Sequence, residues 1–97
     1  MTQRADRMRL TLEARFQPAL LEITDDSASH AGHAGASPGG ETHYSVHMVS
    51  AAFAGVSRVA RSRAVHEALA GEFASGLNAL ALRLQSPEEV MGLEGRA

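Results

Sequence analysis

The chain has 97 residues, of which 44% are hydrophobic and 21% are charged, which is typical of one small globular domain. A formal net charge of -2 provides no overall attraction to nucleic acids, and the absence of cysteine excludes disulfides, thiolate catalysis and an iron–sulfur cluster held by this chain alone. The first ten residues are charged and no long apolar run follows, so we expect a cytoplasmic protein without a membrane span.

The first predicted element is a short amphipathic helix. Its apolar residues recur at steps of three and four, and they are Ala5, Met8, Leu12 and Phe16. Pro18 has no amide hydrogen to continue the helical ladder, so the helix is expected to end before it. Hydrophobic and polar residues then alternate over residues 19–24, which predicts a half-exposed first strand.

A glycine-rich segment separates this strand from the next. Residues 26–41 predict a flexible loop that is too long for a tight hairpin. The loop holds His30 and His33, which are close enough in sequence for one metal ion to contact both imidazoles. Two exposed histidines without a ligand are the alternative interpretation. A second strand is predicted at residues 42–49, with Tyr44, Val46 and Met48 facing the core.

The longest predicted helix follows a short capped turn. Ser50 is expected to cap that turn, and Ser57 is expected to cap a helix that continues to about Ser75. On a helical wheel its apolar stripe contains two polar residues, which we therefore place on or beside the buried face. The stripe consists of Val59, Ser62, His66, Leu69 and Phe73.

Alternation over residues 77–84 predicts a third strand, with Asn78 at the start of its leucine row. Ser86, Pro87 and Glu89 then supply an N-cap, a first-turn proline and a capping-box glutamate for a last helix that frays over residues 92–97. The first two strands can pair antiparallel, whereas a helical crossover favours parallel pairing of the second and third. The sequence predicts a single α+β domain over residues 1–97, of order α-β-β-α-α-β-α, with a three-stranded mixed sheet and helices packed on one face.

Several motifs, in their order and spacing, resemble the BolA family. They are Phe16-Gln17-Pro18, Leu21-Glu22-Ile23, Asp25-Asp26-Ser27, Thr42-His43-Tyr44, Val49-Ser50, Phe53-Ala54-Gly55, Arg61-Ser62-Arg63-Ala64-Val65 and Ala79-Leu80-Ala81-Leu82. The resemblance covers residues 7–89 and implies a class II KH-like fold. It also implies a BolA-like adaptor, not an enzyme, that binds a monothiol glutaredoxin in iron homeostasis or redox signalling. Alone, such a chain is expected to be a monomer or a weak homodimer.

The resemblance further implies a [2Fe-2S] cluster shared with the glutaredoxin and its glutathione. In the family, one ligand is a histidine that opens the last strand, and a second comes from the loop between the first two strands. The loop position corresponds here to His30 or His33, whereas Asn78 stands where the strand histidine is expected. Iron–sulfur clusters take thiolate or imidazole ligands and an amide is a poor substitute, so we expect an apo complex or a labile cluster. Asn78 has an alternative role, a hydrogen bond to a loop.

A second function implied by the resemblance is DNA binding by a transcriptional regulator. Arg58, Arg61 and Arg63 are the candidate nucleic-acid contacts. Against this, Gly55 is not followed by the second glycine of a KH-type loop, and Arg61 and Arg63 project about 200° apart on the helical wheel. Ordinary ion pairs on a solvated helix are the alternative, and DNA ranks below glutaredoxin as a partner.

The remaining histidines have simple structural interpretations. His43 and His47 lie about 13 Å apart along one face of the second strand, so they are expected to face solvent and not to bind one ion. His66 is expected to be a hydrogen-bonded histidine at the edge of the core.

Overall fold

A computed structural model describes residues 3–27 and 41–95, with side chains described up to Gly92. The elements, in chain order, are α1 (Gln3–Phe16), β1 (Leu20–Asp25), β2 (His43–Val49), the 3-10 turn η2 (Ala51–Phe53), α2 (Arg58–Ala68), α3 (Ala70–Ala74), β3 (Ala79–Gln85) and α4 (Pro87–Gly95). The predicted α+β class and order of elements are confirmed, except that the long helix is divided into α2 and α3.

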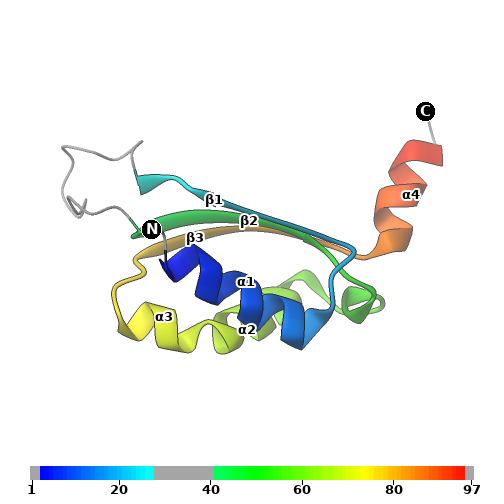
Figure 1. Cartoon of the computed structure of the whole chain (residues 1–97). Coiled ribbons are helices and arrows are strands. Elements are labelled where there is room, and N and C mark those ends of the chain that lie inside the picture. The colour runs from blue at the N-terminus through cyan, green and yellow to red at the C-terminus, as the bar shows by residue number, and fades with distance from the viewer. Residues whose placement is uncertain (1–2, 28–40, 96–97) are drawn as a thin grey trace.

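The three strands form one mixed sheet in the order β1-β2-β3. β1 pairs antiparallel with β2, from Leu20 opposite Val49 to Asp25 opposite Tyr44. β2 pairs parallel with β3, from His43 opposite Ala79 to Val49 opposite Gln85. Both predicted pairings are therefore confirmed. Figure 1 shows α1, α2 and α3 on one side of the sheet, whereas α4 projects from the end of the sheet away from them.

The core lies between the sheet and these three helices. The predicted inward residues of β2 are almost fully buried, and of the predicted stripe of α1 Met8, Leu12 and Phe16 are buried while Ala5 is half-buried, so both sequence patterns are confirmed. The core residues are Met8, Leu12, Phe16, Tyr44, Val46, Met48, Phe53, Val65, Leu69 and Leu77. Ser50 is also fully buried, where its hydroxyl donates to the carbonyl of Phe16 at 2.6 Å and accepts from the amide of Ala52 at 3.1 Å. This serine joins the end of α1 to the predicted capped turn.

The predicted apolar stripe of the long helix is confirmed at Leu69, which is buried, and at Phe73, which packs against the core, but it is wrong for Val59 and His66. Val59 is 60% exposed and His66 is exposed, whereas the buried residues are Arg61, Val65 and Leu69. The chain leaves the α2 helix at Leu69, whose φ of -101° and ψ of 15° separate α2 from α3. Phe73 therefore lies on a different helix axis from Val59, and one wheel cannot describe both.

His66 is satisfied on the surface and not at the edge of the core. Its Nδ1–H donates to the carbonyl of Ser62 at 2.9 Å. Its ring stacks on Phe73 with centroids 5.3 Å apart and an angle of 15° between the planes. The predicted hydrogen-bonded histidine is present, but one helical face away from its expected position.

α4 begins with the predicted capping box. The amide of Ser86 donates to Glu89 Oε1 at 2.8 Å, and the amide of Glu89 donates to Ser86 Oγ at 3.3 Å. The helix continues to Gly95, and the expected fraying over residues 92–97 stays a prediction, while residues 96–97 lie outside the description. Gly92 is tolerated because one glycine weakens a helix by only about 1 kcal/mol. Within the described residues, no helix has the length and apolarity needed to cross a membrane.

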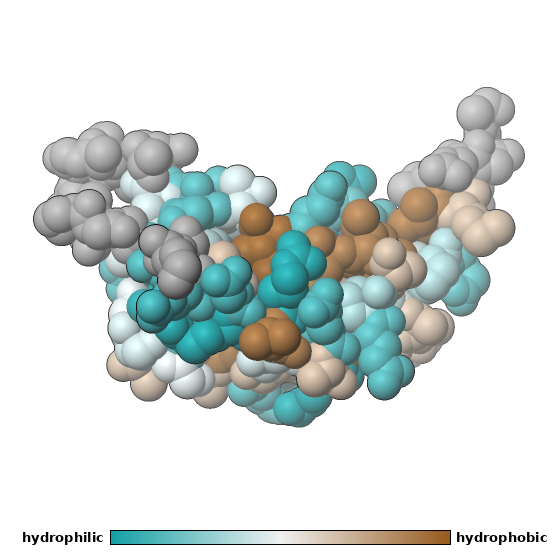
Figure 2. All heavy atoms as spheres, in the orientation of Figure 1, coloured by the Kyte–Doolittle hydropathy of each residue, from teal (hydrophilic) through white to brown (hydrophobic). Residues whose placement is uncertain are grey.

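Most of the face shown in Figure 2 is hydrophilic, but hydrophobic atoms gather in a band above the helices that extends toward α4. Leu20 in β1 is 37% exposed and Met91 in α4 is 69% exposed. Among the described side chains of α4 the apolar ones are half-buried or exposed, so we expect polar contacts to help hold this helix to the domain. The ion pair between Arg61 Nη1 and Glu89 Oε1, 2.7 Å long, is the main such contact among the described residues.

Acid is expected to weaken this attachment. The hydrogen bond from Arg61, followed by that from the Ser86 amide, lowers the pKa of Glu89 from 4.5 to about 2. Since the folded-state pKa is below the unfolded one, the stabilisation is complete above the unfolded value and is lost as the pH falls toward 2. The melting temperature of the wild type minus that of Glu89→Gln should therefore shrink as the pH falls through this window. A difference that stays constant from neutral pH to pH 2 would contradict the assignment.

Candidate functional site

The base of the β1–β2 loop and the start of β3 lie at one end of the sheet, where β1 ends and β2 and β3 begin (Figure 1). On one side, the amide of Asp26 donates to the carbonyl of His43 at 2.7 Å. On the other side, the amide of Asn78 donates to the carbonyl of Thr42 at 2.8 Å. Thr42 and His43 are consecutive, so the Thr42 end of the β1–β2 loop lies beside Asn78, whereas the Asp26 end lies on the other side of β2.

Ser27 closes the base of that loop. Its side chain is buried, and its Oγ accepts from the amides of Thr42 at 3.0 Å and His43 at 3.1 Å. The Ser27 amide donates to Asp25 Oδ1 at 2.9 Å, and the Glu41 amide approaches Asp25 Oδ2 at 3.3 Å. Burial raises the pKa of Asp25, but hydrogen bonds from Ser27 and Glu41 outweigh it and lower the pKa overall. The expected flexible loop 26–41 is thus anchored at its described ends, while residues 28–40 lie outside the described residues.

Replacing Ser27 by alanine is expected to destabilise the protein by about 1–3 kcal/mol, because the buried amide of Thr42 then loses its acceptor. Urea unfolding measures the loss, and amide exchange of Thr42 should accelerate. Ser45→Ala is the matched control, since the half-buried Ser45 hydroxyl donates to Asp26 without satisfying a buried amide. A loss for Ser27→Ala no larger than that for Ser45→Ala would show that Ser27 does not close the loop.

Of the residues at the predicted ligand positions, the structure describes only Asn78. His30 and His33 lie outside the described residues. Asn78 is exposed at the start of β3. Its backbone amide donates to the carbonyl of Thr42, while the hydrogen bond predicted for its side-chain amide stays a prediction. The described part of the chain contains no group of three or more histidine, cysteine or acidic side chains that could hold a metal ion.

His43 is a neighbour of the site that the sequence did not single out. It is half-buried, lies opposite Ala79 in the parallel register, and its Nδ1 is 2.9 Å from Thr42 Oγ1. His47 lies further along β2, where its Nδ1 is 3.2 Å from Glu22 Oε1 and its Nε2 is 2.9 Å from Gln85 Oε1. Both are on the sheet face opposite the core residues, half-buried instead of fully solvent-facing, and they are directed to separate partners.

The donor set at this end fits an iron–sulfur cluster only in part. Imidazole and thiolate are the usual ligands, and an asparagine amide is a poor one. The residue at the strand entrance is therefore unsuited to the task, and any imidazole from the β1–β2 loop must come from outside the described residues. The described geometry supports a place where a partner could meet both segments, but not a complete ligand set.

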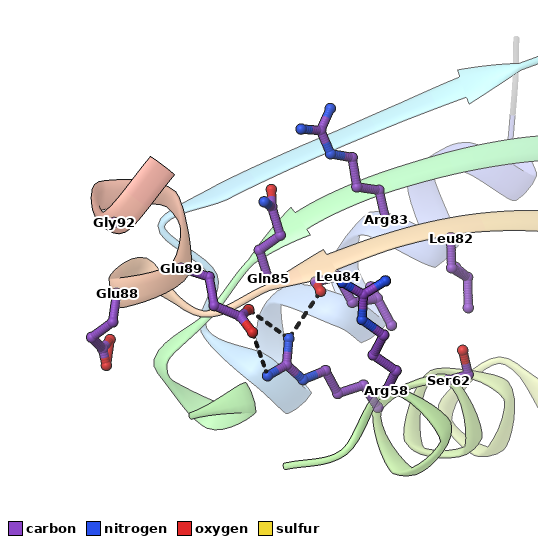
Figure 3. Close-up of a pocket in the computed structure, with 10 residues that line it drawn as sticks. Arg58, Ser62, Leu82, Arg83, Leu84, Gln85, Glu88, Glu89 and Gly92 are labelled. Atoms are coloured by element: carbon purple, nitrogen blue, oxygen red, sulfur yellow. Dashed lines mark hydrogen bonds and ion pairs between the residues drawn. The ribbon is translucent and has the colours of Figure 1, made fainter. Parts of the chain in front are cut away.

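The three arginines predicted as possible DNA contacts differ in their exposure to solvent and in their contacts. Arg61 is only 6% exposed, and its guanidinium contacts Glu89 at 2.7 and 3.1 Å, the carbonyl of Val56 at 2.8 Å and that of Leu84 at 3.1 Å (Figure 3). Its guanidinium carbon lies 5.7 Å from the ring centroid of Phe53. Arg58 and Arg63 are exposed. Since Arg61 is engaged inside the fold, the three residues do not form one phosphate-binding surface, and DNA binding is not proposed.

Arg4 is a second buried arginine, and its burial was not predicted from the sequence. Arg4 Nη1 contacts Glu72 Oε1 at 2.8 Å and Ser75 Oγ at 2.9 Å, while the Arg4 amide donates to Glu41 Oε1 at 3.0 Å. Hydrogen bonds from Arg7, and then the charges of Arg7 and Arg4, hold the pKa of Glu72 below its ordinary value. This cluster joins α1, α3 and the end of the loop. Arg4 lies four residues before Met8, and the buried residues of α1 continue at this four-residue interval, so the spacing could have predicted the burial of Arg4.

Comparisons with known proteins agree on one family. The family model described as BolA-like protein matches residues 12–89. SufE-like protein 1, chloroplastic/mitochondrial, from Arabidopsis thaliana is 43% identical over 91 residues, which cover 90% of this chain and 24% of that protein. An uncharacterised protein in the cobS 5′ region of a Sinorhizobium species is 47% identical over 75 residues, covering 76% of this chain and 81% of that protein.

Solved structures show the same likeness. The BolA domain of SufE1 from Arabidopsis thaliana superposes with a TM-score of 0.82 and 40% sequence identity, covering 92% of this chain and 98% of that domain. The chain is therefore comparable to a whole domain of that plant protein, although it spans 24% of the full-length relative.

Proposed function

This chain belongs to the family of BolA-like proteins, and on that premise we propose that it is an adaptor that binds a monothiol glutaredoxin in iron homeostasis or redox signalling. The BolA-like family is not a known family of enzymes. We accordingly propose a binding role with no catalytic residues. The observation that carries the proposal is the meeting of the β1–β2 loop with the start of β3 through Thr42, which accepts from Asn78 and Ala79.

This arrangement suits a partner that must contact two segments at once. The loop base is held by buried hydrogen bonds, and the start of β3 is held to β2, so the docking site requires little ordering when a partner binds. Asp25 and Glu41 sit at the same base, with the pKa of Asp25 lowered, and they provide negative charge near neutral pH. A glutaredoxin surface that is basic around its active site would complement them.

A shared [2Fe-2S] cluster would be held here by the loop, with His30 or His33 as the imidazole donor from this side. The glutaredoxin and its glutathione would supply thiolates, and the cluster would contribute a redox-active, labile iron centre to the complex. Asn78 is not suited to be the second ligand. We therefore propose that the protein complex forms readily in the apo state and that the cluster is released easily.

The proposal is tested by mixing the chain with its cognate monothiol glutaredoxin and glutathione, with and without iron and sulfide. Light scattering after gel filtration should detect a one-to-one complex without metal, and visible absorption should detect a cluster that is lost quickly. A glutaredoxin variant without its active-site cysteine is the control, because it should retain apo binding and lose the colour. If no complex forms under either condition, the adaptor proposal is wrong.

A further inference from the structure

β3 is an edge strand with backbone groups directed away from the sheet. The amide of Ala79 donates to Thr42 of the β2 side at 3.1 Å, and the carbonyl of Gln85 accepts from Ser50 at 2.9 Å. Because backbone direction alternates along a strand, the amides and carbonyls of Leu80, Leu82 and Leu84 point away from β2. No described strand lies on that side of β3.

A groove of about 790 Å³ follows this edge. It is lined by Leu82 and Leu84, which face the helices, and by Arg83 and Gln85 on the opposite face of the sheet. A groove that touches side chains of both faces must run along the edge of the strand. Figure 3 shows its other walls, which are Arg58 and Ser62 from α2 and Glu88, Glu89 and Gly92 from α4.

The protein itself shows that this edge accepts hydrogen bonds. Arg61 Nη1 donates to the outward carbonyl of Leu84 at 3.1 Å. The same guanidinium binds Glu89, so the Arg61–Glu89 pair closes the α4 end of the groove. The outward amide and carbonyl of Leu82 lie next along the open part of the edge. An added strand would pair with these groups and with the outward amide of Leu84, within the lined part of the groove.

The charge around the groove is positive. Arg58 and Arg83 are exposed and line it, and neither forms an ion pair with another described residue. Of the two lining carboxylates, Glu89 is already neutralised by Arg61, which leaves Glu88. An extended segment with acidic side chains would therefore gain both backbone hydrogen bonds and charge attraction.

We propose that this groove docks an extended acidic segment of a partner protein, which adds to the edge of β3 as a fourth strand. The surface lies at the opposite end of β3 from Asn78, so it is separate from the adaptor site and extends the proposed function. Backbone hydrogen bonds to Leu82 provide affinity, and Arg58 and Arg83 select acidic side chains.

The test uses the full chain labelled with ¹⁵N and an acetylated, amidated hexapeptide that alternates glutamate with threonine. Peptide addition should shift the amide resonances of Leu82 and Leu84 and leave Asn78 unchanged. The double variant Arg58→Glu, Arg83→Glu should bind at least about tenfold more weakly. Arg63→Glu is the control for charge reversal outside the groove: it reverses one charge on α2 and should bind like the wild type. Circular dichroism checks that each variant is folded.

Two further probes separate strand addition from other modes of binding. Peptides methylated on every backbone nitrogen should not bind, because they cannot donate to the edge carbonyls. Equal binding by these peptides, equal losses in Arg63→Glu and the double variant, or no shift at millimolar peptide would each overturn the proposal. Shifts at β3 with an oligothymidine but not with the peptide would also overturn it. Failure here leaves the glutaredoxin proposal standing, because that complex is measured separately by light scattering after gel filtration.

Discussion

Replacing Arg61 by alanine is expected to destabilise the protein by about 2–4 kcal/mol, the largest loss from any single change considered. The guanidinium satisfies the carbonyls of Val56 and Leu84, and its removal leaves both without a donor in a region where the side chain is only 7% exposed. The contact with the Phe53 ring is lost as well. The ion pair contributes less, because the Glu89 side chain is 46% exposed and solvent screens it.

Urea unfolding of Arg61→Ala measures this loss, and Arg63→Ala is the matched control. Arg63 is exposed on the same helix, so its replacement should change the free energy of unfolding by no more than about 0.5 kcal/mol. Arg61→Lys keeps the charge but cannot reach two carbonyls and a carboxylate together, and it should fall between the wild type and alanine. Equal stability of the two alanine variants would show that Arg61 is not a structural residue.

The sequence predicts the buried face of the sheet correctly and that of the long helix only in part, and the burial of Arg61 is one reason for this difference. Strand faces follow strict alternation, and Tyr44, Val46 and Met48 obey it, so their burial was predictable. A helical wheel predicts the buried face only where the helix axis is continuous and the buried residues are apolar. In α2 the buried side contains an arginine, and the axis ends at Leu69, so hydrophobicity alone predicted Leu69 correctly but placed the exposed Val59 and His66 on or beside the buried face.

The candidate site was predictable in outline because chain order and strand pairing determine it. Once β1 and β2 pair antiparallel and β3 joins in parallel, the loop and Asn78 must share one end of the sheet. The hydrogen bonds of Ser27 were not predictable, since a serine after a strand is common in any turn. The groove at the far end could not be foreseen either, because it depends on where α4 projects.

The two proposed surfaces are linked by β3, which begins at Asn78 and ends beside α4. A partner could bind at both ends of β3. Once the first contact had formed, the second would form within the same complex. Weak cluster retention at the Asn78 end would then not prevent a stable protein complex. This arrangement is consistent with an adaptor that stays bound while its cluster is released.

Asn78→His is expected to slow the loss of a reconstituted cluster from the glutaredoxin complex by about tenfold or more, because it restores an imidazole in place of an amide. Visible absorption and circular dichroism follow the colour over time after addition of a chelator. Asn78→Ala is the matched control. The backbone amide of residue 78 still donates to Thr42 in that variant, so the fold is retained, and the cluster should be lost at the wild-type rate.

Replacing His30 and His33 together by alanine should remove the loop ligand and shorten cluster lifetime in both the wild type and the Asn78→His background. If the strand imidazole and the loop imidazole hold the same cluster, the gain from Asn78→His should be largest with the loop histidines present, so the two effects are not additive. Additive effects would place the ligands at separate metals. Equal spectra and equal lability in all variants would exclude a ligand role for either segment, while leaving apo binding to glutaredoxin to be judged by light scattering alone.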